Sequence, residues 1–157
     1  MIRFEHSIEI DQPRDRVFDF LADIDSLPRW QTGVVQSKRL SQGPVRAGFQ
    51  FAESAKVGPW KLKMVCTVTD LKPNERFGFE AKSSGPLDYE GRFDLQPLAG
   101  GTRLTVTGTA WLKGIWRLMQ PVFSGDVKKE LRSELTTLKR LIEAEASMAS
   151  RLAASHS

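Results

Sequence analysis

The sequence predicts an α+β domain in which a curved sheet of seven antiparallel strands wraps around one long C-terminal helix. Two observations carry this prediction. Between residues 33 and 111, alternating apolar and polar runs are separated by turn signals, which is typical of strands joined by hairpins. After residue 113 the apolar residues recur at helical spacing, and this pattern continues for roughly 30 residues.

Length and composition fit one domain. The chain has 157 residues, of which 40% are hydrophobic and 27% charged. We expect a single domain over residues 1–146 and a frayed, small and polar tail over 147–157. No apolar run reaches the roughly 18 residues of a membrane span, and the first residues carry charges instead of a signal segment. These features predict a cytoplasmic protein.

The first strand and two short helices open the chain. Residues 4–10 alternate between apolar and polar and predict a strand with one buried face. Pro13 and Asp15 suit the first turn of a helix, which continues through the apolar positions between Val17 and Ile24. A second short helix is expected to end near Trp30.

Six further strands are expected between the turn signals, so the sheet has seven in all. They cover residues 33–41, 48–56, 60–71, 75–82, 87–97 and 102–111. In the later strands one face is apolar and aromatic, whereas the other is charged and rich in threonine. Gly91 and Gly108 fall on the apolar face, where a missing side chain permits curvature or leaves room for another group.

The closing helix is predicted over residues 114–146, with a kink or an interruption at Pro121. One apolar stripe runs along it, so that face should pack against the sheet. The opposite face carries Lys128, Arg132, Glu134 and Glu143, and we expect it to be solvated.

Three segments resemble those of a known family. They are the stretch from Ile10 to Asp23 with Leu27-Pro28-Arg29-Trp30, the hairpin Gly100-Gly101-Thr102-Arg103-Leu104-Thr105 following Phe93-Asp94-Leu95-Gln96-Pro97, and the closing Leu138-Lys139-Arg140-Leu141-Ile142-Glu143. Together they resemble the polyketide cyclase/dehydrase family of the START/Bet v 1-like superfamily over about residues 3–145. The resemblance implies a helix-grip fold with a deep apolar cavity, used in the superfamily for lipids, sterols, polyketides, quinones and aromatic hormones.

The residues themselves also favour a ligand cavity. Aromatic side chains gather on one face of the predicted sheet, although such rings could simply fill the core. We expect the following residues to contact a ligand: Trp30, Phe49, Phe51, Glu53, Met64, Phe77, Phe79, Tyr89, Phe93, Val106, Met119 and Phe123.

Three side chains are candidates for catalysis. His6 lies on the apolar phase of the first strand and could act as a general base. Glu53 shares its phase with aromatic neighbours, where desolvation would raise its pKa, unless an edge position leaves it in water. Tyr89 could orient a ligand carbonyl or only pack in the core. Cys66, the single cysteine, is expected to be an inert apolar residue and excludes an internal disulfide.

Other chemistries find no matching pattern. No histidine and carboxylate cluster has metal-ligand spacing, and Gly100-Gly101 lacks the lysine and helix of a phosphate loop, so we predict neither a metal nor a cofactor. The net charge of +4 is spread along the chain, which disfavours nucleic acid as a partner.

Three functions therefore remain open, and we favour the first: a protein that binds a hydrophobic small molecule. The second is an enzyme of the cyclase/dehydrase type that acts by acid-base chemistry in the same cavity. The third is an accessory protein that docks on a membrane or a complex through residues 111–123, although we expect that segment to cover the cavity mouth. The sequence determines neither the ligand nor the oligomeric state.

Overall fold

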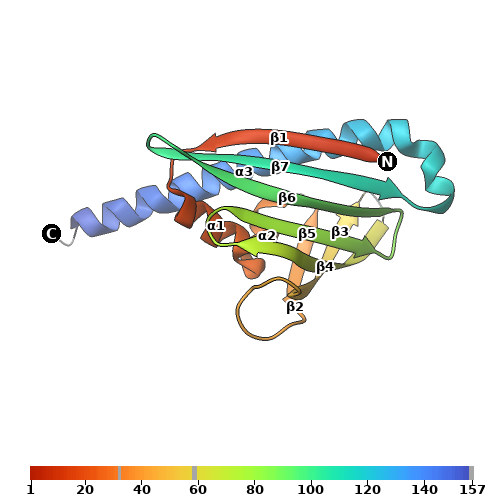
Figure 1. Cartoon of the computed structure of the whole chain (residues 1–157), viewed down its shortest axis with the longest axis horizontal. Coiled ribbons are helices and arrows are strands. Elements are labelled where there is room, and N and C mark those ends of the chain that lie inside the picture. The colour runs from red at the N-terminus through yellow and green to blue at the C-terminus, as the bar shows by residue number, and fades with distance from the viewer. Residues whose placement is uncertain (32, 58–59, 156–157) are drawn as a thin grey trace.

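The computed structural model describes residues 1–31, 33–57 and 60–155 (Figure 1). Within this part, seven strands form one antiparallel sheet in the order β1-β7-β6-β5-β4-β3-β2. The strands are β1 (Ile2–Ile10), β2 (Val34–Arg39), β3 (Gln50–Val57), β4 (Trp60–Lys72), β5 (Arg76–Ser83), β6 (Leu87–Leu98) and β7 (Gly101–Leu112). The link between β1 and β2 is not a hairpin, because the first helices lie there. The predicted fold is confirmed.

The helices form two groups, one between β1 and β2 and one after β7. The first group holds α1 (Arg14–Ala22), the 3₁₀ helix η1 (Ile24–Ser26) and α2 (Leu27–Trp30), and the last strand is followed by η2 (Gly114–Met119) and α3 (Gln120–Ser155). Figure 1 shows α3 running along the sheet behind β1 and β7. Within the described residues, no helix combines the length and the apolar character needed to cross a membrane.

The C-terminal helix is interrupted next to Pro121, one of the two forms predicted for it. A tight 3₁₀ helix ends at Met119 and α3 begins at Gln120, so Pro121 occupies the first turn, where its missing N–H costs no hydrogen bond. At the other end α3 continues to Ser155, although we expected residues from 147 onward to fray. This stretch is rich in alanine and also contains Met148, Arg151 and Leu152, all good helix formers.

Polar contacts fix α3 against the start of the chain. Lys139 donates to the carbonyl oxygen of Glu9 at 2.8 Å and pairs with Glu143 at 2.6 Å. The Glu143 carboxylate also accepts the backbone N–H of Asp11 at 3.0 Å. These bonds position the middle of α3 over the end of β1, so the helix covers the inner face of the sheet.

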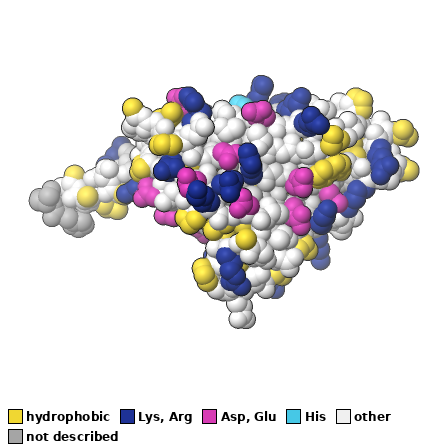
Figure 2. All heavy atoms as spheres, viewed as in Figure 1, with side chains coloured by type: hydrophobic (Ala, Val, Ile, Leu, Met, Phe, Trp, Pro, Cys, Tyr) yellow, Lys and Arg dark blue, Asp and Glu magenta, His cyan; other side chains and the backbone are white. Residues whose placement is uncertain are grey.

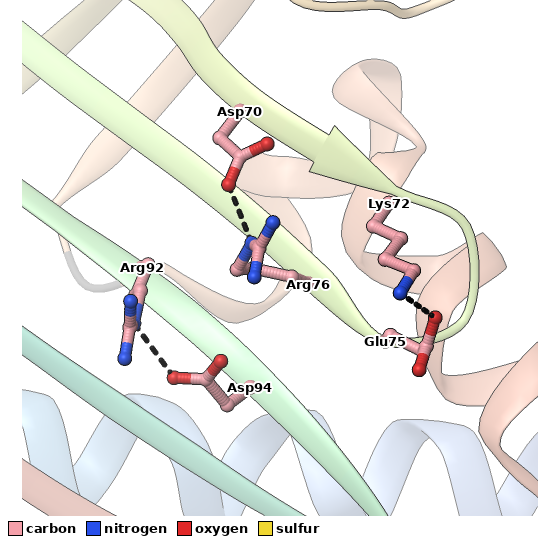
Figure 3. Close-up of polar contacts among 6 residues, drawn as sticks. All are labelled: Asp70, Lys72, Glu75, Arg76, Arg92 and Asp94. Atoms are coloured by element: carbon pink, nitrogen blue, oxygen red, sulfur yellow. Dashed lines mark hydrogen bonds and ion pairs between the residues drawn. The ribbon is translucent and has the colours of Figure 1, made fainter.

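The outer face of the sheet is solvated. Figure 2 shows acidic and basic side chains interspersed on it. Figure 3 shows three ion pairs there: Asp70 with Arg76, Arg92 with Asp94 at 2.9 Å, and Lys72 with Glu75 at 3.1 Å. Such exposed pairs contribute little stability. The core of the protein lies on the other face of the sheet, where the buried hydrophobic side chains are.

Two glycines face each other in the middle of the sheet. Gly91 of β6 and Gly108 of β7 are cross-strand partners, and Phe79 and Phe4 flank them on β5 and β1. A Cβ on Gly91 would lie 2.9 Å from Cζ of Phe79, and one on Gly108 would overlap the ring of Phe4. The two rings therefore occupy the space that side chains at these positions would need.

Candidate ligand-binding cavity

A cavity of about 210 Å³ lies between the inner face of the sheet and α3. Its wall comes from α1, η1 and α2, from all seven strands, and from residues 127–135 of α3. An engineered apolar cavity of about 150 Å³ is large enough to bind benzene. The cavity therefore has room for a substituted ring or two fused rings.

Aromatic rings that touch one another form much of this wall. Phe93 packs against Trp30, Phe77 and Phe79 with ring centroids 6.3, 6.5 and 5.4 Å apart, and Phe79 meets Tyr89 edge-on at 6.0 Å. Offset and edge-on contacts of this kind are favourable, so the rings hold each other in place. The wall of the cavity is consequently preformed.

Most of the expected contact residues border this one cavity. They are Trp30, Phe51, Glu53, Met64, Phe77, Phe79, Tyr89, Phe93 and Val106. The structure does not place Phe49 there: it is buried and its ring packs under the guanidinium of Arg39, 5.8 Å away. Met119 is also outside the cavity, because η2 exposes it to solvent. The side chain of Phe123 lies outside the described residues.

Glu53 is the buried acid of the site. Alternation along β3 puts it on the inner face between Phe51 and Ala55, and its exposed fraction is 2%. Burial raises its pKa from 4.5 to about 7, while a hydrogen bond with the Cys66 thiol opposes this by lowering it. Its second oxygen, Oε2, has no hydrogen-bond partner. Glu53 therefore changes its charge near neutral pH inside an apolar wall.

Cys66 and Tyr89 stay protonated beside this acid. Burial raises the pKa of both side chains, and the charge of Glu53 raises it further. The Cys66 thiol is consequently a poor nucleophile and acts as a hydrogen-bond donor to Glu53. Tyr89 keeps a phenolic hydroxyl in the cavity wall that can donate to a ligand.

His6 does not share the cavity with the other two catalytic candidates. It lies on β1 opposite Val106, is half-buried, and is not one of the residues that border the cavity. Glu53 and Tyr89 do border it together. An acid-base pair in this cavity would thus consist of a carboxyl and a phenol, without an imidazole.

The sequence reasoning missed polar residues from two helices. We expected Glu134 on the solvated face of the C-terminal helix, but it borders the cavity, as does Glu130. Both immediately precede the apolar stripe residues Leu131 and Leu135, so a small rotation of α3 turns them inward. Spacing alone does not fix that rotation, because it depends on how the helix packs against the sheet.

Gln31, at the end of α2, also borders the cavity. Its Oε1 and the Nε1 of neighbouring Trp30 are both buried without a hydrogen-bond partner. Buried polar groups are usually paired, so such atoms beside a cavity favour a ligand or water as the missing partner. No pattern in the sequence distinguishes them from ordinary core atoms.

Residues 114–119 do not cover the cavity mouth, which we had expected. Ile115 and Leu118 of η2 are 81% and 87% exposed, and neither borders the cavity. None of the six residues of η2 is buried. The part of α3 that borders the cavity begins instead at Val127, and Trp30 at the end of α2 borders it as well.

A curved antiparallel sheet closed by a long helix over an apolar cavity is the helix-grip fold, which solved structures of a START superfamily protein and of Ara h 8.0201 share. The model of the family described as polyketide cyclase / dehydrase and lipid transport matches residues 1–143, and the chain belongs to this family. No curated protein matches the chain.

Several solved structures share the fold. A conserved protein from Geobacillus kaustophilus is 21% identical with a TM-score of 0.78, covering 91% of this chain and 96% of its own. A START superfamily protein from Mycobacterium smegmatis is 15% identical with a TM-score of 0.77, covering 90% and 97%. A protein from Thermus thermophilus is 19% identical with a TM-score of 0.76, covering 91% and 98%. At these identities the likeness shows the fold alone.

Proposed function

We propose that this protein binds a hydrophobic small molecule in the cavity between the sheet and α3. The observation that carries the proposal is a preformed cavity of about 210 Å³ walled largely by aromatic and aliphatic side chains. Such cavities with a few polar groups are the usual form of small-molecule sites. The family described for lipid transport and polyketide cyclisation supports the same interpretation.

The volume restricts the ligand. A cavity only somewhat larger than the roughly 150 Å³ that admits benzene is too small for a two-chain lipid. We therefore favour a compact aromatic or alicyclic molecule over a lipid. Its rings would contact Phe51, Phe79 and Phe93.

Binding of 6-acetyl-2-(dimethylamino)naphthalene, a dye with two fused rings whose emission shifts to the blue in apolar surroundings, tests the proposal. Ala55 borders the cavity, whereas Ala52 lies on the opposite face of the same strand. We expect Ala55→Leu to weaken binding at least tenfold by filling the cavity, and Ala52→Leu to leave it unchanged. Equal binding by both variants, or no binding by the unmodified protein, contradicts the proposal.

Acid-base catalysis is the second candidate, favoured by one observation. Glu53, with a pKa of about 7, shares an apolar cavity with Tyr89, and general bases work best when their pKa lies near the working pH. The Kemp elimination of 5-nitrobenzisoxazole reports a base in such a cavity. We expect a rate that rises around pH 7 and is lost in Glu53→Gln. A rate equal to that of the variant would remove this candidate.

A further inference from the structure

The charged residues that border the cavity all have the same sign. Within the described part of the chain they are Glu53, Glu130 and Glu134, together with Glu80, whose register with exposed Glu90 puts its carboxylate on the outer face; no Lys, Arg or His joins them. The chain as a whole has a net charge of +4, so the acidic character belongs to the cavity and not to the protein. A wall of one sign raises the local concentration of ligands of the opposite sign.

Unpartnered acceptors point to a donor on the ligand. Glu53 is only 2% exposed, borders the cavity, and keeps Oε2 without a hydrogen-bond partner. Gln31 Oε1 is a second buried acceptor without a partner on the same wall. A buried acceptor is costly unless a donor meets it, so a donating group on the ligand would remove this cost.

The aromatic rings add the other half of a cation site. Trp30, Phe79, Tyr89 and Phe93 all border the cavity and pack against one another. The faces of such rings attract ammonium groups, and the attraction grows when water is excluded. A carboxylate beside an aromatic wall is therefore suited to a positively charged apolar molecule.

We propose that the ligand is a compact apolar amine, bound as its ammonium ion with the charge paired to Glu53. This inference rests on the proposed binding function and names its ligand class. Among the described residues of the wall, an anionic ligand would meet the carboxyl groups of Glu53, Glu130 and Glu134 and no Lys, Arg or His. A neutral hydrocarbon would leave the buried oxygens of Glu53 and Gln31 without donors.

Charge coupling makes the inference testable through pH. The groups around Glu53 are the Cys66 thiol on β4, Tyr89 on β6 and the acids of α3, while β2 presents uncharged Ser37 and β5 turns Glu80 to the outer face. None of these is a cation, so burial keeps the pKa of Glu53 at about 7. Ammonium binding needs the ionised carboxylate. Affinity should consequently rise about tenfold from pH 6 to pH 8, following the ionised fraction.

A matched series of probes separates the ligand classes. We would measure binding of 2-(1-naphthyl)ethylamine, 2-(1-naphthyl)ethanol and 1-naphthylacetate by isothermal titration calorimetry at pH 6, 7 and 8. All three carry one naphthalene ring, and the amine stays protonated over this range. We expect the amine to bind tightest at pH 8 and to gain about tenfold from pH 6 to pH 8. The affinity of the alcohol should stay level, and the carboxylate should bind weakest.

Variants locate the charge. Glu53→Gln should abolish the pH dependence of amine binding and weaken it at least tenfold at pH 8, while Glu90→Gln, exposed on the outer face of β6, should change neither. If Glu53→Gln fails to fold, the pH profile of the unmodified protein still decides.

Three outcomes overturn the inference. They are tighter binding of the alcohol or carboxylate than of the amine at pH 8, an amine affinity that does not change with pH, and binding of 6-acetyl-2-(dimethylamino)naphthalene without binding of any probe in the series. In each of these cases the binding function stands. If nothing binds, the proposed function falls as well.

Discussion

Ser37 lies directly across the antiparallel ladder from Glu53, and each of the two side chains buries an oxygen that has no hydrogen-bond partner. The pair joins β2 to β3 at the edge of the sheet. A buried polar group without a hydrogen-bond partner lowers the free energy of unfolding, so these two residues reduce the stability of the fold. Functional sites commonly have such a cost in stability.

The stability of the protein should depend on pH through Glu53. Its pKa is about 7 in the folded state against 4.5 in the unfolded chain, so the folded state holds the proton more tightly. The stability from this group is complete below pH 4.5 and is lost as pH rises to about 7. At about 1.4 kcal/mol per pKa unit, the loss reaches up to about 3 kcal/mol.

Urea denaturation between pH 5 and pH 8 measures this dependence. In Glu53→Gln the free energy of unfolding should fall less with rising pH. The difference in stability between the variant and the unmodified protein should therefore shift in favour of the variant as pH rises. Glu90→Gln serves as the control, because its exposed carboxyl should leave the slope as it was. The same slope in Glu53→Gln and in the unmodified protein would contradict the assignment.

Cys66 should react slowly with thiol reagents. Burial and the neighbouring carboxyl raise its pKa, so little thiolate forms at pH 8. We expect Ellman's reagent to modify the native protein at least about a hundredfold more slowly than the protein in guanidinium chloride. Because the chain has one cysteine, the absorbance reports this site alone. Rapid modification of the native protein would show that β4 opens readily.

Two glycine-to-alanine changes should have opposite effects. A Cβ on Gly108 would overlap the carbonyl oxygen of Glu90 and the ring of Phe4, so Gly108→Ala should lower the free energy of unfolding by about 1–3 kcal/mol. Gly125 lies in α3 with open space around it, and Gly125→Ala should raise stability by about 0.5–1 kcal/mol. Thermal unfolding of both variants measures the two changes in stability. Changes in the same direction would contradict the prediction.

The ion pair between α2 and α3 should contribute little. Arg29 and Glu145 are 2.8 Å apart, but about half of each side chain is exposed. A double-mutant cycle on the two should give a coupling below about 1 kcal/mol. Leu138→Ala, at a fully buried position of α3, should cost about 2–5 kcal/mol in the same urea assay. A coupling as large as the leucine effect would be inconsistent with surface screening.

The strands could be predicted because alternation is a local property. The phase that places Phe77, Phe79 and Ala81 on one face of β5 is the phase the structure has. The same alternation along β3 put Glu53 on the inner face. Strand faces need no knowledge of the partner strands, so the sequence was sufficient for this part of the fold.

The helix-borne part of the site could not be predicted in this way. Glu134 was expected in solvent, since a charged residue beside an apolar stripe is usually exposed. Whether it points outward depends on the rotation of α3 over the sheet, which distant contacts such as that of Lys139 with Glu9 decide. The unpartnered atoms of Trp30 and Gln31 likewise follow from tertiary packing alone.

The facing pair Gly91 and Gly108 controls the capacity of the cavity from a distance. Phe4 and Phe79, which lie over the two glycines, also border the cavity. If a methyl group at either glycine displaced its ring, the ring would advance into the cavity. The shape of the cavity is thus open to change through backbone positions that do not border it.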